Sequence, residues 1–234
     1  MSIVVIFIAA LLPAILLWLY VWKKDKKKEP TSWLIKAVVG GVVICIPVVI
    51  VEFILNTLLF GEEGNPSSLI GSTADAFLVA AIPEESFKLL ALWLVLRKNP
   101  YFDEHFDGIV YAVSVGLGFA ALENIVYVFT EENWAITAIS RALLAVPGHY
   151  AFAILMGYYY SVYHFVDHSP KVAACTLLVP VLAHGIYDAI AMGAMVNSFV
   201  ASISFFVIVF FCVKMHKVAK SKVLTQLEKD YKYS

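Results

Sequence analysis

Several acidic and basic side chains interrupt long apolar stretches of this sequence, where an isolated charge is costly. The stretch LVAAIPEESFKLLALWLVL, residues 78–96, is almost entirely apolar, yet Glu84, Glu85 and Lys88 lie near its centre. Carboxylates of this kind serve proteins as general bases, general acids and metal ligands. Ionisable groups of the same character recur in later apolar stretches: Glu52, Glu123, Arg141, His149, His184 and Asp188.

The spacing of these residues indicates which of them can act together. His184 and Asp188 are four residues apart in HGIYD, so on a helix the carboxylate can orient or charge the imidazole. Lys88 lies four residues after Glu84 and three after Glu85. We therefore expect Lys88 to neutralise one glutamate and to leave the other to hold a proton, bind a ligand or act as a base. The spacing leaves open which glutamate takes which role.

The elements that position these residues are predicted from composition. The chain has 234 residues, of which 61% are hydrophobic and 14% aromatic, and its mean hydropathy is +0.82. These values are typical of a membrane protein. A helix that crosses the bilayer needs about 20 mostly apolar residues, which predicts an all-α, polytopic membrane helix bundle with about seven transmembrane helices. The predicted spans are 2–22, 33–60, 74–96, 108–129, 134–160, 172–195 and 197–215.

The distribution of lysine and arginine predicts the orientation. The basic residues follow spans 1 and 3, precede span 6 and fill the C-terminal tail, whereas GEEGNPSS, TEEN and MVNS contain none. The positive-inside rule then places the N-terminus outside and the C-terminus in the cytoplasm. We expect one transmembrane domain over residues 1–217, with the site on spans 3–6, and a short, charged, solvated tail over 218–234. The cysteines lie in apolar stretches and are interpreted as packing residues.

Buried charges are expected to face one another. Each costs about 2.5–3.5 kcal/mol at a membrane helix centre, so the set should point inward and meet in one layer. Pro83, Pro147 and Pro180 lie near this layer, and kinks are tolerated where they line a cavity.

Structural explanations exist for individual members of the set. Glu52 is interpreted as a packing residue, and Arg141 as a counter-ion to Glu123 or Glu85. A lone membrane histidine would usually be a hydrogen-bonded core residue. Structural pairing seldom requires as many acids and imidazoles as are gathered in the group Glu84, Glu85, His149, His184 and Asp188.

Four short motifs give the sequence a family resemblance. EESFK (84–88), FAALEN (119–124), PGH (147–149) with Arg141 before it, and HGIYD (184–188) occur in this order, each on its own predicted span. Together they resemble the PrsW family, bacterial intramembrane proteases distantly similar to the CAAX prenyl proteases. This sequence has Glu123 and Asn124 where the CAAX enzymes have a histidine, which favours the PrsW side of the superfamily.

The resemblance implies an activity and a partner. It implies an intramembrane peptide hydrolase of the bacterial plasma membrane that makes the first, outer-side cut in a single-pass anti-sigma factor. That cut would begin the release of a sigma factor under envelope stress. The expected partners are this membrane protein and the lipid bilayer, without nucleic acid. Matched to the family's motifs, this sequence has its essential catalytic positions at Glu84, Glu85 and His184. His149, Asp188 and Glu123 are further catalytic candidates, supported by Lys88, Asn124 and Arg141.

The residues favour glutamate chemistry over metal chemistry. A buried glutamate suits a general base that takes a proton from water, and His184, held by Asp188, can stabilise the developing oxyanion. A zinc-dependent CAAX-type protease is the alternative, with His149, His184 and Glu85 as ligands, although no HExxH helix is present. No cofactor is favoured.

Two other classes of function fit buried charges. A proton-coupled transporter would use them as a relay but should show two related halves, which this sequence lacks. A catalytically inert membrane scaffold is the third possible function. If the protein is a protease, we expect its substrate helix to reach the site between the third and fourth spans.

Overall fold

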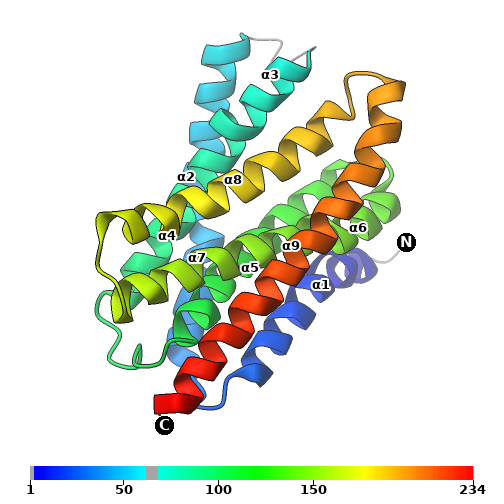
Figure 1. The fold of residues 1–234 in the computed structure, drawn as a ribbon. Coiled ribbons are helices and arrows are strands. Elements are labelled where there is room, and N and C mark those ends of the chain that lie inside the picture. Colours follow the sequence, from blue (N-terminus) through cyan, green and yellow to red (C-terminus); the bar gives the residue numbers. More distant parts are fainter. Residues whose placement is uncertain (1–2, 62–67, 234) are drawn as a thin grey trace.

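The computed structural model describes residues 3–61 and 68–233, and this part of the chain is helical with short connections and without β-strands (Figure 1). This confirms the all-α prediction. The elements are α1 (Ile3–Lys24), α2 (Thr31–Phe60), α3 (Leu69–Ala74), the π-helix η1 (Asp75–Ala81), α4 (Ile82–Leu96), α5 (Asp107–Thr130), α6 (Trp134–Leu143), α7 (Ala145–Phe165), α8 (Pro170–Gly193) and α9 (Ser198–Tyr233).

Six helical segments among the described residues are long and apolar enough to cross a membrane, counting α6 with α7 as one. They agree with six of the predicted spans and confirm the polytopic membrane bundle. The remaining predicted span, 74–96, is also helical, because α3, η1 and α4 follow one another without a break from residue 69 to 96. The connection GEEGNPSS lies largely in residues 62–67, outside the described residues.

Helix α5 forms the centre of the bundle and packs against α1, α2, α4, α6 and α7. Within its most apolar window 72% of the residues are buried, against 11% for α1. Small residues allow the close contact between α5 and α2. A Cβ atom at Gly41 of α2 would lie only 2.0 Å from the backbone oxygen of Val115 in α5. Small residues at helix contacts let membrane helices approach in this way.

Two lysine-rich segments meet the connection between α4 and α5 at one end of the bundle, which we call the basic end. Lys27, between α1 and α2, pairs with Asp103, between α4 and α5, at 2.6 Å. Asp230, near the end of α9, accepts hydrogen bonds from the backbone N–H groups of His105 and Phe106 at 2.7 and 2.9 Å. Lys26, Lys27, Lys28 and the α9 tail therefore lie together, as the charge pattern predicts.

The C-terminal segment differs from the solvated tail expected from its charge. It continues α9 without a break, and Ala219, Val223 and Gln226 are buried. The Gln226 side chain donates to the backbone oxygen of Tyr158 at 3.3 Å. One face of this charged helix is thus packed against α7, because its apolar and amide side chains fall on that face.

A buried glutamate lies between α1 and α2 at the basic end. Glu29 accepts a hydrogen bond from the hydroxyl of Tyr111 in α5. Burial raises the pKa of Glu29 to about 7, the tyrosine hydroxyl opposes this change, and the neighbouring Asp25 carboxylate adds to it. This end of the molecule therefore contains a group that titrates near neutral pH.

Candidate active site

The backbone turn that presents Glu84 and Glu85 is set by Pro83. Proline lacks an N–H and clashes with the carbonyl four residues earlier, so a regular α-helix cannot pass through it unchanged. The chain instead forms the π-helix η1, in which the N–H of Ile82 bonds to the oxygen of Phe77, five residues before it. π-Bulges of this kind are frequent at functional sites. Both glutamates consequently lie buried in the first turn of α4.

Lys88 is the centre of the cluster. Its Nζ atom lies 2.8 Å from Glu84 Oε2, 2.8 Å from Glu85 Oε1 and 3.2 Å from His149 Nδ1. The ammonium has three N–H donors, and these three acceptors use all of them. The ring of Phe119 closes another side of the ammonium, with its centroid 4.3 Å from Nζ. Lys88 therefore neutralises charge on both glutamates, and the expectation that it serves only one of them was wrong.

The contacts of His149 fix its protonation state. Lys88 can only donate, so His149 Nδ1 must accept and carries no proton. The other ring nitrogen, Nε2, lies 2.8 Å from Glu123 Oε2 and donates to it. His149 is therefore a neutral imidazole with its proton on Nε2. In this way α7 is linked to α4 through Lys88 and to α5 through Glu123.

His184 lies between two carboxylates. Its Nδ1 is 2.9 Å from Glu85 Oε1, and its Nε2 is 3.0 Å from Asp188 Oδ2, on the next turn of α8. Each ring nitrogen has an acceptor, so the imidazole can carry both protons and a positive charge. The ring of Phe152 stacks on His184 at a centroid distance of 4.9 Å. The predicted contact between His184 and Asp188 is confirmed.

Close packing brings α8 to the glutamate turn. A Cβ atom at Gly185, directly after His184, would lie 2.4 Å from the ring of Phe77 in η1. Only glycine leaves room for this ring. The same π-helix that presents the glutamates thus also holds the helix that carries His184.

Arg141 and Asn124 tie the cluster to its surroundings. Arg141 Nη2 lies 2.9 Å from Glu123 Oε2, and its Nε donates to Asn124 Oδ1 at 2.8 Å. Asn124 in turn donates to the backbone oxygen of Ala10 in α1 at 2.6 Å. Of the two partners expected for Arg141, the structure selects Glu123. The α6 and α1 helices are held to α5 by these contacts.

Burial divides the site into an inner part and an open edge. The Glu85 side chain has no exposed area, whereas those of Glu123 and Asp188 are 22% and 16% exposed. Arg141 is also partly exposed. The partly exposed edge of the site is therefore formed by Glu123 of α5, Arg141 of α6 and Asp188 of α8.

The structure brings together every residue that the sequence predicted for the site. Glu52, interpreted as a packing residue, makes no ion pair with the cluster in the described part of the chain. Two further aromatic residues belong to the site and were not predicted: the rings of Phe119 and Phe152 shield Lys88 and His184. Phe119 begins the motif FAALEN and Phe152 lies three residues after PGH, but aromatic residues are common throughout the chain, so neither position indicated a role in the site.

The donor set is suitable for a metal ion. Ligand atoms of Glu84, Glu85, His149 and His184 all lie within 4.8 Å of one another. Imidazole nitrogen and carboxylate oxygen are ordinary zinc ligands, and Glu85 Oε2 is buried without a hydrogen-bond partner among the described residues. The ammonium of Lys88, however, contacts three of the four donor groups. A divalent ion and this ammonium would therefore compete for the same atoms.

Comparison with known proteins agrees with the motifs and the geometry. Residues 29–214 match the family described as PrsW family intramembrane metalloprotease. The chain is 36% identical to Protease PrsW of Clostridioides difficile (strain 630) over 193 residues, which cover 80% of this chain and 79% of the relative. It is 32% identical to Protease PrsW of Oceanobacillus iheyensis over 214 residues, covering 91% and 94%. Protease PrsW of Bacillus subtilis (strain 168) is 36% identical over 183 residues, covering 77% and 79%.

No solved structure matches this chain significantly. The matched region includes all four motifs and every helix that contributes a side chain to the cluster. With bacterial relatives and several membrane-spanning helices, the protein is a multi-pass bacterial membrane protein. The chain belongs to the PrsW family of intramembrane proteases.

Proposed function

We propose that this protease makes the outer-side, site-1 cut in a single-pass anti-sigma factor and so starts the release of a sigma factor. One observation carries the proposal: Glu84, Glu85, His149 and His184, from three helices, meet in a buried cluster, and Glu85 Oε2 has no hydrogen-bond partner among the described residues. Such a cluster would be an expensive way to hold helices together. The positive-inside orientation would place the cluster toward the outer half of the membrane, which agrees with an outer-side cut.

Glu85 is the general base in this proposal. Its Oε1 is held by Lys88 and His184, whereas Oε2 is buried without a hydrogen-bond partner among the described residues. Oε2 can therefore accept a proton from a water molecule. The water oxygen then forms a bond to the scissile carbonyl carbon, and the proton passes from Glu85 to the departing amine nitrogen as the C–N bond breaks. Glu84 shares the ammonium of Lys88 and keeps it in place.

His184 provides positive charge beside the reacting carbonyl. Because each ring nitrogen has a carboxylate partner, the doubly protonated ring is held in a fixed orientation by Glu85 and Asp188. A fixed charge in a water-poor pocket stabilises a developing oxyanion without reorganising. Its contribution is electrostatic, because both N–H groups already have acceptors.

We propose that the chemistry is of the glutamate type. The support is Lys88, whose ammonium already serves as the cation for the donors that a metal would need. If a zinc ion is bound, Glu84, Glu85, His149 and His184 would hold it, with Lys88 displaced. Zinc would supply a Lewis acid for the carbonyl oxygen and would make the bound water more acidic. Exhaustive chelation of the detergent-purified enzyme separates the two types: retained cleavage is expected, and cleavage that is lost and then restored by zinc overturns the proposal.

The proposed activity is tested by co-expression with a tagged single-pass anti-sigma factor from the same bacterium. Glu85→Gln and His184→Ala should each abolish the product seen with the wild-type chain. Glu52→Gln is the control, because it also neutralises a membrane glutamate but removes no ion pair of the cluster in the described part of the chain. Mass spectrometry of the product should locate the cut on the outer side of the substrate helix. A cut on the cytoplasmic side, or a product that persists in both cluster variants, contradicts the proposal.

A further inference from the structure

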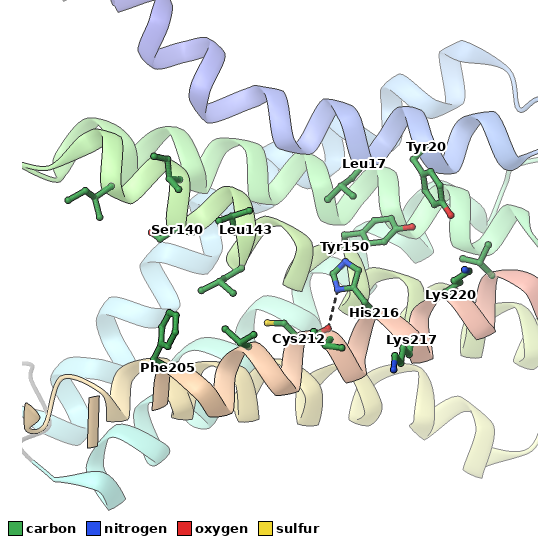
Figure 2. A pocket seen from close by; sticks show the side chains of 16 residues that line it. Leu17, Tyr20, Ser140, Leu143, Tyr150, Phe205, Cys212, His216, Lys217 and Lys220 are labelled. Carbon is green, nitrogen blue, oxygen red and sulfur yellow. Dashed lines mark hydrogen bonds between the residues drawn. The ribbon is translucent and has the colours of Figure 1, made fainter. Parts of the chain in front are cut away.

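A long apolar groove lies on the bilayer-facing surface beside the site. Figure 2 shows it between α6 and α1 on one side and α9 on the other, with Tyr150 of α7 at its floor. Its volume is about 990 Å³. The walls contain almost only apolar side chains along the part lined by Leu143 and Phe205. The groove is therefore open to something that is itself apolar.

One face of α9 lines the whole groove. Phe205, Val209, Cys212 and His216 all contribute to it and are spaced three or four residues apart, as on one helix face. The length of α9 from Phe205 to Lys220 is about 22 Å at 1.5 Å per residue, which is most of a hydrocarbon core of about 30 Å. A groove of this length fits an element that crosses the membrane beside α9.

Two helices, α6 and α7, contribute side chains both to the groove and to the site. Ser140 lines the groove, and the next residue, Arg141, binds Glu123 in the site. Likewise Tyr150 forms the groove floor, and the preceding residue, His149, belongs to the cluster. Neighbouring residues of these two helices therefore face the groove and the site, which lie on different sides of the same helices. An extended segment leaving the groove at the break between α6 and α7 would reach the partly exposed side of the cluster.

Charge is confined to one end of the groove. Figure 2 shows Tyr20, His216, Lys217 and Lys220 together, at the end opposite Phe205. Two lysines beside an apolar groove complement a helix that is apolar along its length and carries an acidic residue at this end. A lipid would fill the apolar part, but its position would have no relation to the edge of the site.

We propose that the transmembrane helix of the substrate docks in this groove, with an acidic residue near its end facing Lys217 and Lys220. The inference rests on the proposed function and adds the path by which the substrate reaches the site. It differs from the path expected between the third and fourth spans. There Lys88 of α4 lies against the ring of Phe119 of α5.

Photo-crosslinking tests the docking without requiring catalysis. In the full-length Glu85→Gln variant, Ile139 or Val209 is replaced by the photoreactive residue benzoylphenylalanine, and a tagged single-pass anti-sigma factor is co-expressed. Ile46 of α2 is the matched control, because it is 65% exposed, against 62% for Ile139, but lies outside the groove. Substrate adducts are expected from 139 and 209 and not from 46. Equal adducts from 46, no substrate adducts from the groove, or adducts with lipid only would overturn the proposal.

Cleavage by active enzyme tests the same groove independently. Val209→Trp should lower cleavage of the membrane substrate at least tenfold, whereas Ile46→Trp should leave it within twofold of wild type. Lys217→Glu with Lys220→Glu should lower it as well, and a substrate whose acidic end residue is changed to lysine should recover. Unchanged cleavage in all groove variants contradicts docking there. If wild type cleaves nothing, the proposed function fails, and the crosslinks still decide where the helix docks.

Discussion

Removal of the Lys88 ammonium is the most direct test of how the cluster is held together. Its Nζ makes contacts of 2.8, 2.8 and 3.2 Å with two carboxylates and an imidazole. Hydrogen bonds to charged groups contribute about 1.5–3 kcal/mol each, so the gross stabilisation by three contacts is about 4.5–9 kcal/mol. The cost of burying the ammonium offsets part of it. Breaking a buried ion pair from one side typically costs about 3–5 kcal/mol, which is the loss we expect for Lys88→Met.

Denaturant titration of the purified protein, followed by tryptophan fluorescence, measures this loss. Methionine keeps most of the unbranched stem of Lys88, so the change in packing is small. Lys36→Met is the control, because the Lys36 side chain is exposed. Among the described residues, its ammonium contacts the ring of Trp33, at 3.8 Å from the ring centroid. That variant should lose no more than about 1 kcal/mol. If Lys88→Met is also within about 1 kcal/mol of wild type and still cleaves substrate, Lys88 does not organise the site.

The same variant reports on competition between the ammonium and a metal. Without Lys88, four donor groups lie within reach of one ion and one positive charge is missing. Zinc should then stabilise Lys88→Met more than it stabilises wild type, by at least about 1.4 kcal/mol, equivalent to tenfold in affinity. Equal effects of zinc on both proteins would show that the ammonium and the metal do not use the same atoms.

Three further predictions concern other parts of the structure. Asp188→Asn should lower cleavage about 10–100-fold while the thermal melting curve stays close to that of wild type, because the imidazole loses its charged partner but keeps its place. Gly41→Ala should destabilise the protein by about 1–3 kcal/mol in the same denaturant titration, since its Cβ would meet a backbone oxygen of α5, whereas Gly40→Ala, with its nearest contact at 3.8 Å, should not. Wild-type stability should fall as pH rises from about 4.5 to about 7, because the unfolded chain loses its Glu29 proton at a lower pH than the folded protein does. Thermal melting of Glu29→Gln should show a smaller fall over the same pH range.

The amino-acid sequence alone was sufficient for the class of protein and the contents of the site. Hydropathy is a local property, so runs of about 20 apolar residues identify membrane helices wherever they pack. Contacts within one helix follow from spacing, as for His184 with Asp188 and Glu84 with Lys88. The cost of buried charge predicts that such residues gather, but it does not specify which atoms meet.

Only the tertiary structure decided the pairings between helices. Lys88 reaches His149 across 61 residues of sequence, and His184 reaches Glu85 across 99. These distances depend on how each helix is rotated and how closely it packs, which is set by contacts such as Phe77 against Gly185. The π-helix before Pro83 adds a rotation that hydropathy cannot reveal.

The groove and the packing of the C-terminal helix were likewise decided only by the tertiary structure. Hydropathy identified α9 as a span and charge identified its tail, but neither indicates that α9 stands apart from α6 or that Asp230 caps the loop at residues 105 and 106. In a bilayer every outward face is apolar, so a face that lines a groove has the same composition as one that faces lipid. Local sequence therefore specifies which segments enter the membrane, and packing between them determines where a second helix can fit.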